Sequence, residues 1–240
     1  MSTALKEWKV RPHGPLLNVA DNIMTVEGDI DMPVGTMRRR MTVVRLRDGR
    51  LIIWSAISLD EDEMRNIERF GRPTFLIVPN AHHRMDARAW KDRYPAMAVV
   101  APEGAREKVA EVVPVDATTA SFDDPDVTFV TVPGTKGQEA ALEIVNPNGV
   151  ILVLNDIVAN IRDARGFGGW MLRLMGFAGD TPQVPVPIRL MLIENQRALA
   201  AQLLRWATIP TLRRIIVSHG ETIGDDPRGV LRDLAVQLGA

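Results

Sequence analysis

The sequence predicts an α/β protein, with a pair of mixed β-sheets and helices on both outer sides. Three observations lead to this fold class. Strand-like and helix-like segments alternate along 240 residues. Turn signals such as Asp48-Gly49 indicate hairpins, so the sheets cannot be purely parallel. Unbroken apolar runs such as Thr74–Val78 are typical of strands buried on both faces, so helices should cover the sheets.

The first half of the chain is rich in expected strands. Thr42–Leu46 and Leu51–Trp54 flank the Asp48-Gly49 turn and predict a hairpin, with Asn22–Glu27 as a strand before it. Leu59–Phe70 has apolar residues three apart and acidic residues early, which predicts an amphipathic helix. The elements expected next are strand Thr74–Val78, helix Ala87–Arg93, strand Ala98–Ala101 and helix Gly104–Val112.

The second half begins with strands and ends with helices. Val127–Val132 and Ala140–Val145 flank a Gly-rich turn, Pro133–Gly137, and Val150–Leu154 is the most hydrophobic strand. After Asn160 we expect a glycine-rich helix, the Pro-rich linker Pro182–Pro187 and a helix over Arg189–Ala207. Strand Ile215–Val217 and a last helix follow. The apolar stripe of this last helix is Val230, Leu231, Leu234 and Leu238.

Composition excludes several classes of function. Basic and acidic residues number 29 and 30, so no net charge draws the chain to nucleic acid or to an anionic membrane. There is no cysteine, so a metal would need His and carboxylate ligands, and there are only four His. Met1–Arg11 lacks the apolar core of a signal peptide, and no run approaches the roughly 18 apolar residues of a spanning helix. We expect a cytoplasmic protein with neither nucleic-acid nor membrane partners.

Polar groups with metal-ligand character follow three of the expected strands. They are Asn80–Asp86, Asn155-Asp156 and Ser218–Gly220. Each group alone is explained by a structural role, because a single His at a strand end is usually just hydrogen-bonded and an Asp there often caps a helix. Their recurrence at strand ends, where loops converge on a rigid scaffold, favours a functional site.

The ordered set of these marks resembles the metallo-β-lactamase-fold superfamily, and more closely a degenerate branch of unknown function. The resemblance runs from about Asn22 to the C-terminal helix. It rests on Met41–Gly49 with Trp54-Ser55, Pro79–His83, Trp90-Lys91, Tyr94-Pro95, Asn155-Asp156 and Ser218–Gly220. It implies an αββα sandwich with a site along one edge of the two sheets, in a single domain over 1–240 with a helical insertion at about 161–207.

The superfamily's ligands carry over only in part. Its His-x-His-x-Asp-His signature places its first His on Asn80 and its second on His82, but its last two positions fall near Arg84 and Met85, which are not metal ligands. The resemblance matches the bridging Asp to Asp156 and the last His to His219. Thr135 and Lys136 stand where a further His is expected. His83 and Asp86 are additional candidate ligands.

This reduced set implies at most one zinc or iron ion, because catalytic zinc needs three protein ligands and an open position. The leading hypothesis is a hydrolase of a small molecule in which Asp156 or Asp86 orients or deprotonates a water. Asn80, Lys136 and Arg84 are the candidate substrate-binding residues. The main alternative is a non-catalytic relative, without metal, that binds a small ligand or a partner in the same cleft. A third hypothesis is a doubly wound α/β domain that imitates the order of motifs.

The segment Gly166–Phe177 has three interpretations. Phe167, Trp170, Met171 and Leu174 share one face of the expected helix. This face can be ordinary core, a cover over the active site with mobile glycine ends, or the contact of a homodimer.

Overall fold

The computed structural model describes residues 4–32, 35–164 and 166–240. The chain folds as two compact units, Met1–Asp124 and Pro125–Ala240. Each unit has its own β-sheet and its own hydrophobic core. The single domain with a helical insertion that the resemblance implies stays a prediction.

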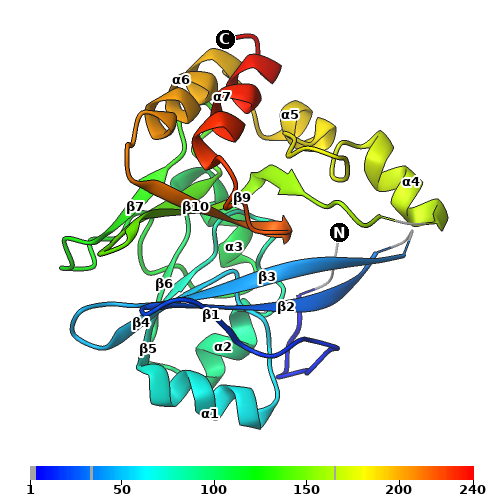
Figure 1. Ribbon diagram of the computed structural model, residues 1–240. Coiled ribbons are helices and arrows are strands. Elements are labelled where there is room, and N and C mark those ends of the chain that lie inside the picture. The colour runs from blue at the N-terminus through cyan, green and yellow to red at the C-terminus, as the bar shows by residue number, and fades with distance from the viewer. Residues whose placement is uncertain (1–3, 33–34, 165) are drawn as a thin grey trace. The chain divides into compact units, whose positions relative to one another are not determined.

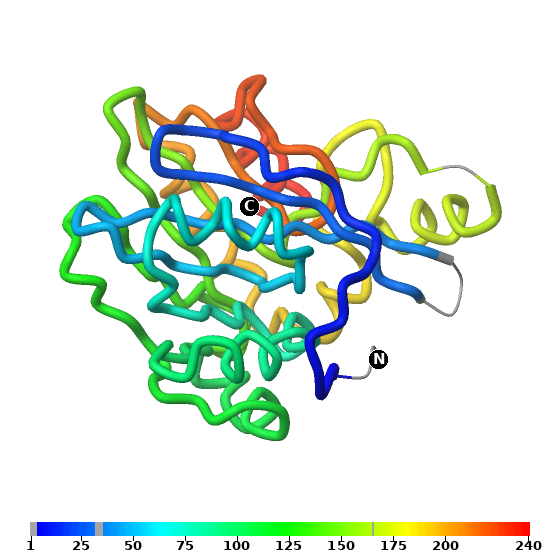
Figure 2. The backbone as a smooth tube through the Cα atoms, turned by 90° about the horizontal axis from the view of Figure 1, so that it is seen from below, coloured from blue at the N-terminus to red at the C-terminus, as the bar shows by residue number. Residues whose placement is uncertain are grey.

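The first unit contains a six-stranded mixed sheet in the order β1-β2-β3-β4-β5-β6 (Figure 1). β1 to β4 are antiparallel neighbours, whereas β5 is parallel to both β4 and β6. Figure 2 follows β2 and β3 as two long strands lying side by side. The strands are β1 (Leu17–Ala20), β2 (Ile23–Met32), β3 (Gly35–Arg45), β4 (Arg50–Trp54), β5 (Arg72–Ile77) and β6 (Ala98–Val100).

Helices cover one face of this sheet, below it in the view of Figure 1. α1 begins where the Asp60 side chain accepts a hydrogen bond from the Glu63 amide, and its first turn is acidic, as a helix N-terminus favours. Met64 and Ile67 of α1 and Trp90 of α2 are fully buried in the core beneath the strands. The helices of this unit are α1 (Glu61–Phe70), α2 (Ala87–Arg93), the short 3-10 helix η1 (Glu103–Ala105) and α3 (Arg106–Ala110).

The second unit contains a four-stranded mixed sheet in the order β10-β9-β8-β7. β9 and β10 are parallel, and the other two pairs are antiparallel. α6 and α7 lie together on one side of the sheet, where Trp206, Leu203 and Leu231 join its core. The elements are β7 (Val127–Thr131), β8 (Ala140–Asn146), β9 (Gly149–Asn160), α4 (Gly166–Leu174), α5 (Val186–Met191), α6 (Gln196–Ala207), β10 (Leu212–Gly220) and α7 (Pro227–Gln237).

These elements confirm the predicted fold class of two mixed sheets with helices. Two sheets, both with antiparallel pairs, also exclude the doubly wound hypothesis, which requires one open and mainly parallel sheet. No helix among the described residues is long and apolar enough to cross a membrane.

Three local expectations were wrong. Arg189–Ala207 is not one helix, because α5 ends at Met191 and α6 begins at Gln196, where the Asn195 side chain caps it through the Ala198 amide. The expected linker Pro182–Pro187 already holds the start of α5. The polar residues Asn155-Asp156 and Ser218–Gly220 do not follow their strands but lie inside β9 and β10.

The aromatic face of α4 is not part of the core. The side chains of Phe167, Trp170 and Leu174 are 69%, 56% and 65% exposed. The interpretation of this face as ordinary core is therefore wrong.

Candidate functional site

His83 lies in a tight turn that follows β5 in the first unit. The Asn80 side chain shapes this turn, because its Oδ1 accepts a hydrogen bond from the His82 amide at 2.8 Å while its carbonyl accepts one from the His83 amide. The turn gives the two adjacent histidines different surroundings: His82 is exposed, and His83 is only 7% exposed. Of the two, His83 has the surroundings of a metal ligand.

Ser55 holds the imidazole of His83 at one of its two ring nitrogens. Ser55 Oγ lies 2.6 Å from His83 Nδ1, and both residues are buried. Ser55 follows β4 and has φ of 55°, a left-handed conformation that is uncommon for a residue other than glycine. Because Ser55 contacts Nδ1, a metal ion would bind His83 through its other ring nitrogen, Nε2. A strained backbone position is typical of functional sites.

Asp86 has strong partners within its own unit. Its carboxylate forms a buried ion pair with Arg39, and its other oxygen accepts a hydrogen bond from the Ser58 amide at 3.1 Å. Arg39 also donates to the Ala56 carbonyl. Asp86 thus ties the segment after β4 to the start of α2.

Arg84 is turned toward the short helix α3. It pairs with Glu111 at 2.8 Å and donates to the Lys108 carbonyl. The hydrogen bond from Lys108, together with the contact of Arg84, holds the pKa of Glu111 below its ordinary value. Arg84 thus links this loop to residues at the end of α3.

Asp156 and His219 come together in the second unit. Asp156 Oδ1 and His219 Nε2 lie 3.2 Å apart, and both side chains are buried. The pairing of β9 with β10 shifts here: Val217 pairs with Leu154, but His219 pairs with Ala159. Four residues of β9 therefore stand opposite Ser218 alone. Such bulges redirect side chains next to active sites.

The same bulge places two more polar side chains in the second unit. Ser218 Oγ donates to Asn155 Oδ1 at 2.5 Å, and both side chains are buried. Asn155 Nδ2 has no hydrogen-bond partner among the described residues, which is uncommon for a buried amide. Phe177 packs its ring edge-to-face against the His219 imidazole, with centroids 6.4 Å apart.

Lys136 lies in the Gly-rich turn between β7 and β8. Its backbone is left-handed, with φ of 55°, and its Nζ donates to the Met191 carbonyl at the end of α5 at 3.3 Å. The neighbouring Thr135 is buried and donates its hydroxyl to the Val132 carbonyl. This turn therefore holds a cation where the superfamily's pattern has a histidine.

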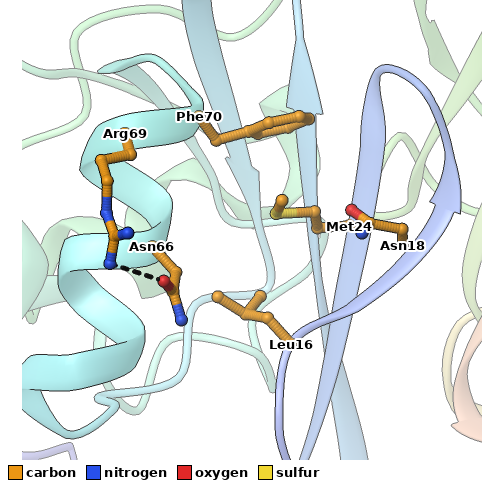
Figure 3. Close-up of a pocket in the computed structure, with 6 residues that line it drawn as sticks. All are labelled: Leu16, Asn18, Met24, Asn66, Arg69 and Phe70. Carbon is orange, nitrogen blue, oxygen red and sulfur yellow. Dashed lines mark hydrogen bonds between the residues drawn. The ribbon is translucent and has the colours of Figure 1, made fainter.

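A surface pocket of the first unit is made of other residues. It lies between α1 and the hairpin of β1 and β2 and has a cavity volume of about 390 Å³ (Figure 3). Figure 3 shows Phe70, Met24 and Leu16 facing it beside the polar Arg69, Asn66 and Asn18. None of the candidate site residues lines this pocket.

Three buried side chains therefore have the chemistry to hold a metal ion: His83 in the first unit, and Asp156 and His219 in the second. The donor pair in the second unit fits this use, because two atoms bound at about 2.1 Å to a tetrahedral ion lie about 3.4 Å apart. An ordinary hydrogen bond between the two side chains has similar geometry.

Sequence reasoning gave no role to three polar residues of these sites. The sequence indicated the position of Ser55 at the end of an apolar strand. It did not indicate the left-handed backbone of this serine, which has no sequence signature. Asn155 and Ser218 are neighbours of predicted ligands. Their pairing depends on the bulge of β9, which no local pattern indicated.

The chain was compared with known families, curated proteins and solved structures. No family model and no curated protein matches it. Among solved structures, the metallo-β-lactamase FIM-1 from Pseudomonas aeruginosa, in its mono-zinc form, is 11% identical, with 97% of each chain covered and a TM-score of 0.63. The metallo-β-lactamase from Erythrobacter litoralis is 14% identical, with 92% of this chain and 96% of that chain covered and a TM-score of 0.63.

A third similar structure is the metallo-β-lactamase from Hirschia baltica. It is 13% identical, with 94% of this chain and 98% of that chain covered and a TM-score of 0.62. These likenesses extend over nearly the whole chain, and they agree with the two mixed sheets. The chain therefore has the metallo-β-lactamase fold.

Proposed function

We propose that this protein is a metal-dependent hydrolase with a reduced site that binds one ion. The observation that carries the proposal is the buried Asp156–His219 pair at the bulge of β9, with ligand atoms 3.2 Å apart. A third ligand is required for a catalytic zinc ion. Between the two adjacent histidines, His83 is the better candidate because it is buried and its Nδ1 is already engaged by Ser55.

The proposed ligands have supports typical of metal sites. A ligating histidine usually bonds a polar group through its other ring nitrogen, which is what Ser55 provides for His83. When bound, a zinc or iron ion would polarise a substrate oxygen and make a bound water a nucleophile near neutral pH. Asp156 would orient that water or accept its proton. Asn155 Nδ2 would donate a hydrogen bond to the substrate.

Asp86 and Arg84 have positioning roles in this proposal. Both oxygens of Asp86 are engaged, by Arg39 and by the Ser58 amide, so Asp86 would fix the loop that carries His83. Arg84 would anchor the same loop to α3 through Glu111. Lys136 is exposed, and its ammonium group has a backbone carbonyl, that of Met191, as its hydrogen-bond acceptor. It is therefore the better candidate for contact with an anionic substrate.

The experiment measures zinc binding to metal-free protein by calorimetry and elemental analysis, with His83→Ala, Asp156→Asn, His219→Ala and the adjacent His82→Ala as variants. We expect one ion per chain, lost in the first three variants and kept in His82→Ala. Circular dichroism of each variant checks that it is folded. Hydrolysis of β-lactam, lactone, ester and phosphodiester probes by the loaded protein then assigns the reaction.

A second candidate function is supported by the departures from the superfamily's ligand pattern. At these positions, Asn80 shapes its own turn, Arg84 pairs with Glu111 and Met85 is buried. Lys136 supplies a fixed positive charge. Such a protein would bind an anionic ligand without metal. Zinc binding that is absent, or that His219→Ala leaves unchanged, would overturn the hydrolase and favour this ligand-binding function.

A further inference from the structure

Two helices of the second unit carry a concentration of exposed apolar side chains. Of the eleven large apolar side chains exposed among the described residues, six lie on α4 and α5. We call these six side chains the α4–α5 patch, and their exposed fractions run from 48% to 76%. They are Phe167, Trp170, Leu174, Val186, Leu190 and Met191.

The patch is held together by local contacts. The Phe167 and Trp170 rings stack at 5.8 Å with their planes 29° apart. The Val186 amide, at the start of α5, donates to the Met175 carbonyl just after α4 at 2.9 Å, which fixes the two helices next to each other (Figure 1). None of the candidate site residues belongs to the patch, although Lys136 Nζ contacts the backbone carbonyl of Met191. The side chains of the patch are exposed and have no part in the proposed hydrolysis.

The size of the patch is unusual for a protein that works alone. Aromatic side chains present about 150–250 Å² each. With a value toward the lower end of that range for the aliphatic side chains and Met, these exposed fractions leave about 650 Å² of apolar surface. The largest patch of a typical monomer is about 300–600 Å². One side of a standard protein interface is about 800 Å². The patch alone nearly reaches what one subunit contributes to a stable dimer.

The chemistry of the segment resembles the core of a protein interface. Such cores are rich in Trp, Phe, Met and Arg and poor in Lys and Glu. The stretch 161–191 has all four enriched residue types and has no lysine and no glutamate. Helices that bind anionic membranes usually carry many lysines and arginines on their polar face. This stretch has four arginines and two aspartates, so its net positive charge is small and favours a protein partner.

Charges at the border of the patch are self-complementary. Arg173 lies 3.8 Å from Asp180 within one chain, and both are exposed. Arg162, which lies 3.7 Å from Glu221, and Asp163 add one charge of each sign beside α4. In a two-fold interface the same surface meets itself, so each arginine can face an aspartate of the other copy. A surface that carries both signs suits this arrangement.

We propose that the α4–α5 patch is the contact surface of a homodimer, with a second copy of this chain as its occupant. The stacked Phe167 and Trp170 would form the centre and the Arg173–Asp180 pair the border. Aromatic residues at the centre of an interface commonly dominate its binding energy.

The test measures mass against concentration by sedimentation velocity for the full chain, for Leu190→Asp and for Val236→Asp. Leu190 is 76% exposed within the patch, and Val236 is 67% exposed on α7 outside it, so neither change should disturb folding. We expect dimers at micromolar concentration for the parent and for Val236→Asp, and at least a tenfold weaker association for Leu190→Asp.

Trp170 gives a second readout at the patch itself. Of the five tryptophans, Trp54, Trp90 and Trp206 are fully buried and Trp8 is partly buried, so Trp170 dominates the solvent-sensitive emission. Its emission should shift to the blue as the dimer forms, and Trp170→Phe should abolish the shift.

Three results would overturn the proposal. The first is a parent that stays monomeric at about 100 μM, far above the affinity of standard interfaces. The second is a dimer that Leu190→Asp does not weaken. The third is a monomer whose Trp170 emission shifts only with phosphatidylglycerol vesicles, which would assign the patch to a membrane surface.

Discussion

At the scale of the residue, the candidate site depends on a few short polar contacts. Ser55 orients His83 in the first unit, and the bulge of β9 lets Asp156 reach His219 in the second. The resemblance to the metallo-β-lactamase superfamily implied His82 as the ligand, whereas burial in the folded turn favours His83. A sequence pattern identifies the loop, but the turn formed by Asn80 decides which imidazole is buried.

Ser55 allows a test of ring orientation. Ser55→Ala and Ser55→Gly both remove the hydroxyl next to His83 Nδ1, so both should weaken zinc binding by about 10-fold to 100-fold, measured by competition with a chelator. Glycine also relieves the left-handed backbone, so Ser55→Gly should be more stable than Ser55→Ala by about 1 kcal/mol in urea unfolding. Unchanged zinc affinity in both variants would remove Ser55 from the site.

Tyr94, the only tyrosine, gives a prediction about pH. Burial, together with the hydrogen bond that its hydroxyl donates to Glu68, raises the pKa of Tyr94 to about 12. The folded state therefore keeps the phenol proton above pH 10, where an unfolded chain releases it. Its contribution to stability is complete below pH 10 and is lost as the pH rises toward 12.

The ultraviolet absorbance of tyrosinate follows this ionisation directly. The native protein should titrate well above the denatured protein. Glu68→Gln should move the pKa only part of the way back, because burial is the larger cause. A native titration that coincides with the denatured one would contradict the assignment.

At the scale of the element, strands and helices were predicted wherever a local signal existed. Asp48-Gly49 indicated the hairpin of β3 and β4, and the pairing of Thr42 with Trp54 confirms it. The break between α5 and α6 was missed because Leu192 and Ile193 continue the apolar pattern, and only the cap by Asn195 reveals it. The bulge of β9 was missed because it results from pairing with β10, which is distant in sequence.

Gly220 is needed where β10 leaves the candidate site. Its φ is +94°, and a Cβ there would lie 2.1 Å from the Asn160 carbonyl oxygen. Gly220→Ala should therefore push β10 from β9 beside His219, lower the free energy of unfolding by about 3 kcal/mol and weaken metal binding.

Gly49→Ala is the matched control for this change. Gly49 has a similar φ of +81°, but a Cβ there meets nothing within 4 Å. It should cost only the backbone strain, about 1 kcal/mol, and leave metal binding unchanged. Equal costs for the two variants, measured by thermal and urea unfolding, would show that the close approach of Asn160 is unimportant.

At the scale of the whole molecule, the sequence predicted two mixed sheets because these depend on hydrophobic periodicity and turn residues. The likeness to metallo-β-lactamases over more than 90% of the chain, at 11–14% identity, agrees with that prediction. Side-chain exposure was harder to predict. Phe167 and Trp170 have the spacing of core residues, and only the folded chain shows that they are exposed.

The edge strand β1 of the six-stranded sheet has a consequence for solubility. β1 has only four residues, and its pairing with β2 is interrupted between Asn18 and Ala20. A border this short and irregular is a poor template for a strand from another molecule. Intermolecular β-aggregation is thus hindered on this side of the sheet, even though Leu17 is largely exposed there.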